Sequence, residues 1–167
     1  VFQSLLYAAF LCLIAFLILI QFNFLTISLG LGSMFLAFAY PYMKRITYWP
    51  QLFLGITFNW GILMAWTAMN NNISIDIIIL YISAIFWTLG YDTIYGAQDM
   101  SDDEIIGLKS TSIKFKKNIK LFVSFTYFIS ILMLIFLFWD FINFNLTTIL
   151  LVSFFTSLVY QLVKVDF

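Results

Sequence analysis

The sequence from Ile75 to Ser110 reads IDIIILYISAIFWTLGYDTIYGAQDMSDDEIIGLKS, and it changes character near its middle. Its first part, Ile75 to Gly90, is an apolar run with one acidic residue, Asp76, near its start. Its second part, Tyr91 to Ser110, holds five of the eight acidic residues of the chain. Ionisable residues at membrane depth are costly and usually functional. This stretch therefore predicts a membrane-spanning helix with a functional site at its end.

The composition of the 167 residues indicates that the whole chain lies in a membrane. Apolar residues make up 63 % of it and charged residues 10 %, whereas a soluble domain is typically ~45–50 % apolar and ~25 % charged. The apolar runs are long and do not alternate with polar residues, so they predict helices and not the strands of a barrel. We expect an all-α, multi-pass transmembrane helical bundle, in which residues 1–167 form one domain within the lipid bilayer.

Six apolar runs have about the length that a membrane span requires. They are Leu5–Gln21, Leu25–Tyr40, Trp49–Ala68, Ile75–Gly90, Leu121–Trp139 and Leu146–Val163. Pro41 is expected to end the second run, because the residue before a proline is pushed out of the α region. Pro50 is expected in the first turn of the third run, where a missing N–H costs nothing.

All eight lysine and arginine residues fall on one side of this topology. They are Lys44 and Arg45 after the second span, Lys109, Lys114, Lys116, Lys117 and Lys120 after the fourth, and Lys164 after the sixth. Basic residues concentrate in cytoplasmic loops, so the acidic segment is expected on the cytoplasmic side of a bacterial inner membrane or on the matrix side in a mitochondrion. The bias toward Ile, Phe, Asn and Lys is typical of an AT-rich genome and favours the bacterial membrane.

Several classes of chemistry are excluded by what the sequence lacks. It has no histidine, which excludes a Ser/His/Asp triad and a histidine metal site in these residues. It has neither a GxxxxGK[ST] loop nor a GxGxxG turn for a nucleotide. The net charge of zero argues against binding to nucleic acid. The single cysteine, Cys12, lies in an apolar run and is expected to pack there. Carboxylates and lysines are left as the candidate functional groups.

The acidic segment suggests a metal site. Read at 100° per residue, the residues that fall on one face of a single helix are Asp92, Tyr95, Asp99, Asp102 and Asp103. At an effective dielectric of ~20, two carboxylates ~5 Å apart repel by ~3 kcal/mol, so this face favours a bound cation. Oxygen ligands without Cys or His select Mg²⁺ before Ca²⁺ or Mn²⁺, and Mg²⁺ usually shares its sites with a substrate phosphate. The alternative is a solvated acidic helix end followed by a basic loop.

Basic and amide side chains are further candidates for a binding site. Lys109 brings positive charge to the acidic segment and suits a phosphorylated ligand such as a diphosphate. Lys44 and Arg45 lie on the same side, either to bind a substrate or only to anchor the topology. Asn59 is a polar residue within the third span, and it either bonds a neighbouring helix or lines a substrate cavity.

Two stretches resemble the intramembrane aromatic prenyltransferases, in particular those that attach polyprenyl chains to 4-hydroxybenzoate in ubiquinone biosynthesis. They are YPYMKRITYWPQLFLG, residues 40–55, and YDTIYGAQDMSDDEIIGLKST, residues 91–111. In the second stretch, Asp99 and Asp103 have the four-residue spacing of the family's second Asp-rich motif. The resemblance implies a nine-helix bundle of which this chain is a middle-to-late part. The family's first motif, NDxxDxxxD, has no match here, so we expect the chain to be incomplete at both ends and inactive alone.

The resemblance also implies how the acidic residues act. Asp99 and Asp103 would hold Mg²⁺, and Asp102 would be a further metal ligand. The metal would bind the diphosphate of a polyprenyl diphosphate, with Lys109 as a direct contact. In this reading an allylic cation forms as the diphosphate leaves, and the ring of 4-hydroxybenzoate attacks it.

Other residues are assigned to the aromatic acceptor. Lys44 or Arg45 would hold the carboxylate of 4-hydroxybenzoate, and Arg is the better partner because its planar fork forms two parallel hydrogen bonds. Asp92 and Tyr95 are second choices, for the metal, the diphosphate or the phenol. Asn59 is included as a residue of the substrate cavity.

Two other functions stay open at this point. One is a prenyltransferase of the same family with another aromatic or lipid acceptor. The other is a subunit of a cation-coupled transporter, in which acids within the membrane coordinate the coupling ion. The transporter is disfavoured because the acids gather at one end of the spans instead of the midplane, and because no Gly- or Pro-broken helix is expected.

Overall fold

The computed structural model of the chain describes residues 2–142 and 145–165, and in these residues it contains helices and no strand. The α-helices are α1 (Phe2–Leu19), α2 (Phe24–Ile46), α3 (Pro50–Phe58), α4 (Trp60–Asn70), α5 (Ile75–Gln98), α6 (Met100–Ile106), α7 (Thr111–Lys114), α8 (Ile119–Leu137) and α9 (Leu146–Lys164). A one-turn 3-10 helix, Trp139–Phe141, follows α8.

Six segments are long and apolar enough to span a membrane, which confirms the predicted class and number of spans. Helices α3 and α4 together form the third span, Pro50–Asn70. Two spans extend further toward the charged loops than predicted, since α2 continues beyond Tyr40 to Ile46 and α5 continues beyond Gly90 to Gln98. These additional turns carry four candidate site residues: Lys44 and Arg45 in α2, and Asp92 and Tyr95 in α5.

The expectation that Pro41 ends the second span was wrong, because Pro41 lies inside α2. A proline within a helix removes one backbone hydrogen bond, and membrane helices tolerate this loss because neighbouring groups satisfy the freed carbonyl. The helix continues for another turn, in which Lys44 and Arg45 lie. Positive charges are favourable at that end because they offset the negative end of the helix dipole. Pro50 begins α3, as predicted.

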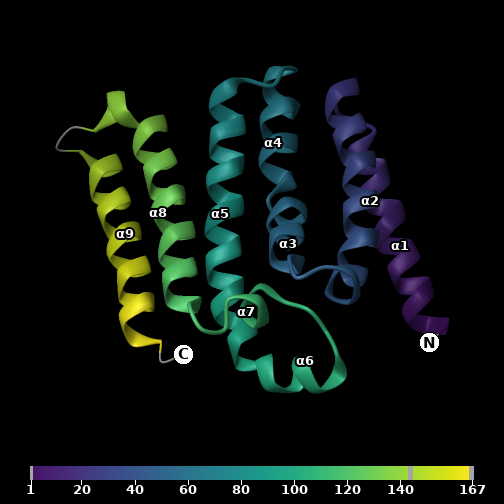
Figure 1. Cartoon of the computed structure of the whole chain (residues 1–167). Coiled ribbons are helices and arrows are strands. Elements are labelled where there is room, and N and C mark those ends of the chain that lie inside the picture. The colour runs from purple at the N-terminus through teal and green to yellow at the C-terminus, as the bar shows by residue number, and fades with distance from the viewer. Residues whose placement is uncertain (1, 143–144, 166–167) are drawn as a thin grey trace.

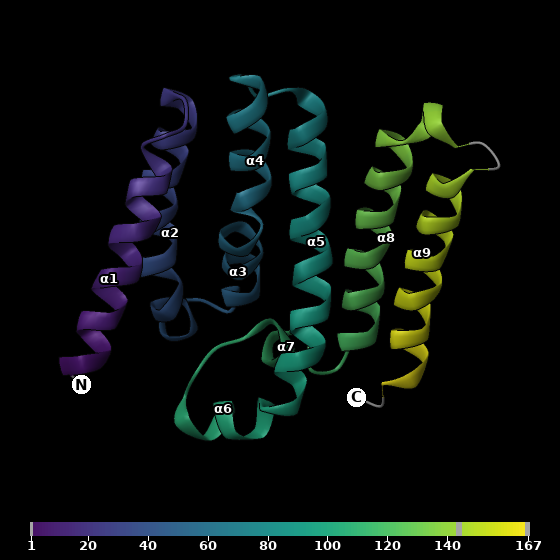
Figure 2. The same ribbon diagram turned by 180° about the vertical axis from the view of Figure 1, so that it is seen from behind.

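The spans stand side by side, with α5 near the centre (Figures 1 and 2). Helix α5 packs against α3, α4, α6, α7 and α8, whereas α1 contacts α2 and α9 contacts α8. The N-terminal and C-terminal ends both lie at the end of the bundle where α6 and α7 are found (Figure 1). The short helices α6 and α7 connect α5 to α8 there, so this connection is built against the most enclosed helix of the bundle.

The closest helix packing occurs between α5 and α8. The buried apolar cluster in this region consists of Ile119, Val123, Tyr127 and Leu158. A Cβ at Gly90 would overlap the ring of Tyr127 and would lie 2.7 Å from Oγ1 of Thr126, so the close approach of the two helices requires glycine. Further along the same pair, Ser83 Oγ donates to the carbonyl oxygen of Ser130 at 2.9 Å. Small and hydroxyl residues therefore bring α5 and α8 together, as is usual within membranes.

Candidate functional site

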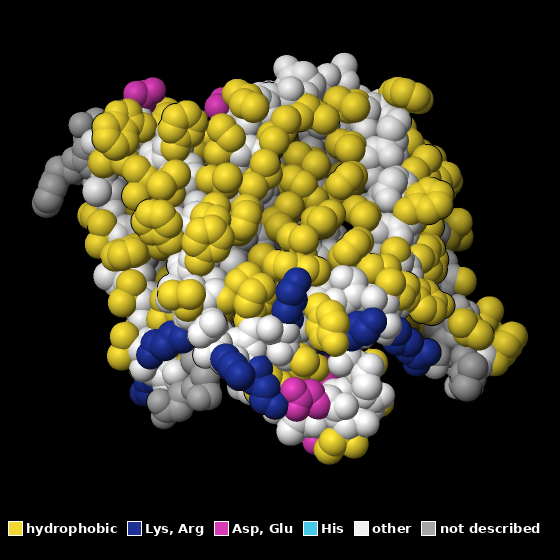
Figure 3. Space-filling model, viewed as in Figure 1, with side chains coloured by type: hydrophobic (Ala, Val, Ile, Leu, Met, Phe, Trp, Pro, Cys, Tyr) yellow, Lys and Arg dark blue, Asp and Glu magenta, His cyan; other side chains and the backbone are white. Residues whose placement is uncertain are grey.

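The basic residues gather at the end of the bundle where α6 and α7 lie. Figure 3 shows Lys and Arg side chains across the lower end of the face in view, beside acidic side chains, with apolar side chains covering most of the rest. Two acidic residues, Asp76 at the start of α5 and Asp140 after α8, belong to the opposite end. Most of the charge therefore lies at one end of the bundle, which we call the charged end, and the candidate site lies there.

The acidic segment is not a single helix, so the prediction of one continuous acidic face was wrong. Helix α5 ends just before Asp99 and α6 begins just after it. Asp92 and Tyr95 belong to α5, and Tyr95 is 63 % exposed, whereas Asp102 and Asp103 lie in the first turn of α6. A continuous helix would place like charges on the same side. A new helix start instead places two carboxylates at the positive end of a helix dipole, where they are stabilising.

Asp103 is the enclosed member of this acidic group. It is 7 % exposed, whereas Asp99 and Asp102 are exposed and Asp92 is half-buried. Lys44 of α2 pairs with Asp103, and its Nζ lies 3.4 Å from Oδ2 of the carboxylate. Lys44 of α2 therefore partly neutralises the enclosed carboxylate of α6.

Hydrogen bonds hold Lys109 against the last turn of α2, which contains Lys44. We call the contact region formed by Lys44, Asp103 and Lys109 the seam. The N–H of Lys109 donates to the carbonyl oxygen of Lys44 at 2.8 Å, and its ammonium donates to the carbonyl oxygen of Ile46 at 3.2 Å. Gly107, with a φ of 79°, ends α6. The N–H of the next residue donates to the carbonyl oxygen of Asp103 at 2.8 Å, which is the bond of a Schellman turn. This turn directs the chain back to α2 and brings Lys109 beside Lys44.

Buried hydroxyl groups anchor the segment that follows. Ser110, Thr111 and Ser112 have no exposed surface. The Thr111 and Thr93 hydroxyls lie 2.7 Å apart, and Ser112 Oγ donates to the carbonyl oxygen of Thr93 at 2.8 Å. The N–H of Thr111 donates to Oε1 of Gln51 at 2.9 Å. Sequence reasoning missed Gln51 and Thr93, although a glutamine two residues after the start of the apolar run Trp49–Ala68 was a usable signal.

Two predicted substrate residues take no part in the hydrogen bonds and the ion pair of the seam. Arg45 is exposed in the last turn of α2, and in the part of the chain that the structure describes it forms no ion pair. Asn59 is 8 % exposed, and its Nδ2 donates at 2.8 Å both to the carbonyl oxygen of Gly55 and to Oγ1 of Thr88 in α5. Of the two alternatives for Asn59, the bond to a neighbouring helix is the one observed. Its contact with a substrate stays a prediction.

The third span is interrupted, contrary to the expectation of unbroken helices. Asn59 separates α3 from α4, and its backbone angles of φ −86° and ψ 1° depart only modestly from the helix. The amide of Asn59 fills the interruption through its bonds to α5. At 1.5 Å per residue, Asn59 lies about 13 Å along the span from Pro50, so this irregular backbone does not reach the acidic residues of α6.

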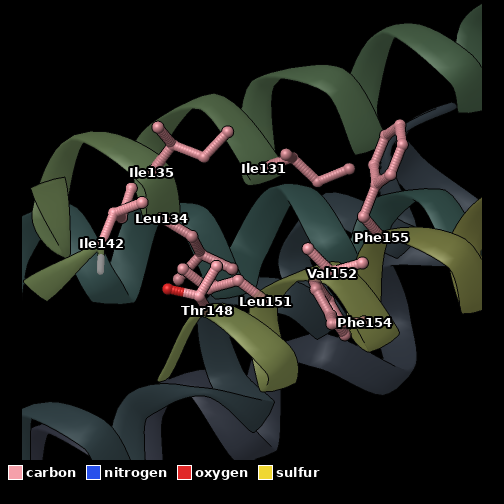
Figure 4. Close-up of a pocket in the computed structure, with 9 residues that line it drawn as sticks. All are labelled: Ile131, Leu134, Ile135, Ile142, Thr148, Leu151, Val152, Phe154 and Phe155. Atoms are coloured by element: carbon pink, nitrogen blue, oxygen red, sulfur yellow. The ribbon is translucent and has the colours of Figure 1, made fainter. Parts of the chain in front are cut away.

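A separate hollow at the opposite end lies between α8 and α9 (Figure 4). Its volume is about 270 Å³, and its lining residues are Ile131, Leu134, Ile135, Ile142, Thr148, Leu151, Val152, Phe154 and Phe155. Because no ionisable side chain lines it, this hollow can hold hydrocarbon but offers nothing to bind a diphosphate. The chemistry predicted for the chain therefore belongs at the charged end.

The acids of α6 fit Mg²⁺ in their chemistry but do not surround an ion by themselves. Within residues 2–142 and 145–165, no three Asp, Glu or Cys side chains come close enough together to hold a metal. Asp102, next to Asp103 in sequence, and Asp99, four residues before it, are exposed oxygen donors. Mg²⁺ is commonly bound by one or two carboxylates, with water and substrate phosphates in its other positions. The described residues can thus supply part of such a site.

Known proteins resemble this chain in sequence. The chain is 47 % identical over 124 residues to the Homo sapiens protein named 4-hydroxybenzoate polyprenyltransferase, mitochondrial, a match that covers 74 % of this chain and 33 % of the human protein. It is 50 % identical over 108 residues to the Arabidopsis thaliana protein of the same name, a match that covers 64 % of this chain and 26 % of the Arabidopsis protein. The chain thus spans a quarter to a third of the length of these relatives.

The fold and the family-wide sequence pattern agree with these matches. A solved structure, the apo form of a UbiA homolog from Aeropyrum pernix K1, superimposes with a TM-score of 0.74 at 20 % identity, covering 89 % of this chain and 57 % of that one. At this identity the likeness establishes the helical fold alone. The UbiA prenyltransferase family matches residues 1–166. The chain is therefore an integral membrane protein that belongs to the UbiA prenyltransferase family.

Proposed function

We propose that the chain is part of an enzyme that transfers a polyprenyl group from polyprenyl diphosphate to the ring of 4-hydroxybenzoate, in ubiquinone biosynthesis and with Mg²⁺. The observation that carries the proposal is the seam at the charged end, where Asp103 of α6 pairs with Lys44 of α2 and Lys109 bonds the same turn. The names of the relatives support the choice of acceptor.

Charged residues gather at one end of the bundle, and apolar side chains cover most of the spans. This arrangement suits a substrate with a charged head and an apolar tail. The diphosphate would lie at the seam, where positive charge is held close to carboxylates, and the prenyl chain would follow the apolar surfaces of the spans. In the reaction, the bond between the allylic carbon and the diphosphate oxygen breaks, and its electron pair leaves with the diphosphate. A ring carbon of the acceptor forms the new bond and then loses its proton.

Each residue at the seam has a proposed role in this reaction. Asp99, Asp102 and Asp103 would hold Mg²⁺, which when bound draws negative charge from the leaving diphosphate. Lys109 would bind the diphosphate. The side chain of Lys44 is 42 % exposed even while it pairs with Asp103, so its ammonium is accessible to an anionic ligand. The ammonium of Lys44 can thus pair with the carboxylate of the acceptor.

The remaining candidates surround the seam. Arg45 is exposed beside Lys44 at the end of α2, where its guanidinium is available for the acceptor carboxylate. Asp92 and Tyr95 on the last turns of α5 are second choices for the metal, the diphosphate or the phenol. We place this end of the bundle on the cytoplasmic side of a bacterial membrane or the matrix side of a mitochondrial one, because all the basic residues lie there.

The test is prenyl transfer to 4-hydroxybenzoate in membranes, with Mg²⁺ present and then chelated. Because the chain spans a third or less of its relatives, we compare it alone with a version joined to the remaining segments of a full-length relative. We expect metal-dependent product only from the extended version. In that version, Asp103→Asn should lower the rate about 100-fold or more, on the scale of losing one electrostatic contact to the transition state.

The matched control is Asp140→Asn, which removes an acid from the opposite end of the bundle. It should retain the activity of the extended version. A silent extended version would overturn the proposed reaction, and an equal loss in the two variants would show that the acids of α6 have no special part in it.

A further inference from the structure

Two adjoining hollows lie where α7 leads into α8. The first has a volume of about 480 Å³ and is lined by Lys116, Lys117, Asn118, Ile119, Lys120, Leu121 and Val165. The second has a volume of about 560 Å³ and is lined by Phe115, Asn118, Leu121, Phe122, Ser124, Phe125 and Phe128. Both volumes fall within the ~300–1,000 Å³ of typical ligand sites. Because Asn118 and Leu121 line both, a basic hollow continues directly into an apolar one.

The positive charge of the basic hollow is only partly neutralised. Lys116 pairs with Glu104 of α6, with 2.7 Å between Nζ and Oε2. Lys117 and Lys120 are exposed, and across the described ranges 2–142 and 145–165 neither forms an ion pair. Among the residues that the structure describes, no acidic side chain lines either hollow. Two lysines therefore face solvent at the membrane boundary with their charge available to an anion.

The apolar hollow follows the outer surface of α8 into the membrane. Phe115 and Phe122 stack at its entrance, with ring centroids 4.0 Å apart and planes inclined by 9°. Further along the helix, Phe125 and Phe128 are 59 % and 62 % exposed. Since α8 is a candidate membrane span, these rings face hydrocarbon beyond the charged end. The surface can hold an acyl chain whose head group lies among the lysines.

We propose that these hollows form a binding site for one anionic phospholipid, with its phosphate between Lys117 and Lys120 and an acyl chain along Phe125 and Phe128. Basic pockets at the cytoplasmic or matrix end of membrane helices are suited to anionic head groups. The prenyl diphosphate is a poorer match, because a diphosphate that is bound through a metal requires carboxylates, and the described lining of this site supplies none. The site is separate from the seam at Asp103 and does not rest on the proposed reaction.

The experiment titrates the purified full chain in detergent with phosphatidylglycerol or with phosphatidylcholine of the same acyl chains, and counts bound lipids by native mass spectrometry. We expect phosphatidylglycerol to bind more tightly. The K117Q/K120Q double variant should weaken its binding about 25-fold, because each basic residue near an anionic lipid contributes about fivefold. The control is K114Q/K164Q, which removes the same charge from the same end of the bundle at two exposed residues that do not line the hollows, and it should bind phosphatidylglycerol as the unmodified chain does.

Three results would overturn the proposal. Equal binding of the two lipids would show that the site does not select for charge. An equal loss in the two double variants would reduce the effect to the general attraction of a basic surface. Displacement of phosphatidylglycerol by an equal concentration of inorganic diphosphate would assign the lysines to the head group of a diphosphate. Circular dichroism of each variant confirms that the helices are retained, so that weaker binding reports on the site.

Discussion

Helices α1 and α5 are both apolar enough to span a membrane, but they pack in opposite ways. The 18 residues of α1 all lie within the described part of the chain, and none of them is buried. Helix α5 has seven buried residues, and four of these are Ser, Thr or Gly: Ser83, Thr88, Gly90 and Thr93. Its other three buried residues, Ile77, Ile85 and Leu89, are apolar. Buried small and hydroxyl side chains are therefore a feature of the central helix α5 that α1 does not share.

How membrane helices pack depends on the solvent that surrounds them. Lipid tails are as apolar as leucine, so burial of an apolar side chain gives little preference for protein over lipid. Close packing and hydrogen bonds between helices provide the preference instead. The contrast predicts that substitutions of small and hydroxyl residues on α5 destabilise the fold, whereas equivalent substitutions at positions without such contacts do not.

The largest effect is expected for Gly90→Ala. The added Cβ would overlap the ring of Tyr127, which is 2 % exposed. Overpacking of this kind typically costs about 1–3 kcal/mol. The free energy of unfolding in detergent, measured by titration with a denaturing detergent, should fall by that amount.

Gly61→Ala is the matched control for this prediction. A Cβ at Gly61 would have no atom within 4 Å, and alanine is favoured over glycine in a helix by about 1 kcal/mol. The variant should be as stable as the unmodified chain or slightly more stable. If both variants lost the same stability, close packing at α5 would not be what distinguishes the central helix.

A smaller effect is expected for Thr93→Val, which keeps the shape of the side chain but removes its hydroxyl. Thr93 Oγ1 lies 2.7 Å from the hydroxyl of Thr111, which has no exposed surface. Loss of one partner from a buried pair costs about 1 kcal/mol. Thr156→Val on α9 removes an exposed hydroxyl that donates to the carbonyl oxygen of Ser153 in the same helix, and it should change the unfolding free energy by less than about 0.5 kcal/mol. Equal losses would contradict the contrast between centre and edge.

The same physics explains which features the sequence could predict. Hydropathy predicts all six spans, because the cost of a polar backbone in lipid leaves helices as the way to cross. The concentration of charge between Tyr91 and Lys120 places the candidate site at one end. The break at Asp99 was not predictable from helical periodicity, because it depends on how α6 and α7 fold back onto α5. The pairing of Lys44 with Asp103 depends on a contact 59 residues apart in sequence, so local patterns do not contain it.

The smallest effect distinguishes the two ion pairs at the charged end. Lys116 and Glu104 are closer, at 2.7 Å, but their side chains are 52 % and 38 % exposed. Lys44 and Asp103 are 3.4 Å apart, and the carboxylate is 10 % exposed. Exposed pairs contribute little because water and salt screen them.

Double-mutant cycles with Lys→Met and Asp→Asn or Glu→Gln should therefore give a coupling of about 0.5–1 kcal/mol for Lys44 with Asp103, and about 0–0.3 kcal/mol for Lys116 with Glu104. Raising the salt to about 1 M should remove most of the second coupling and leave most of the first. A stronger coupling for Lys116 with Glu104 would mean that distance, and not enclosure, decides the strength of ion pairs at this end of the bundle.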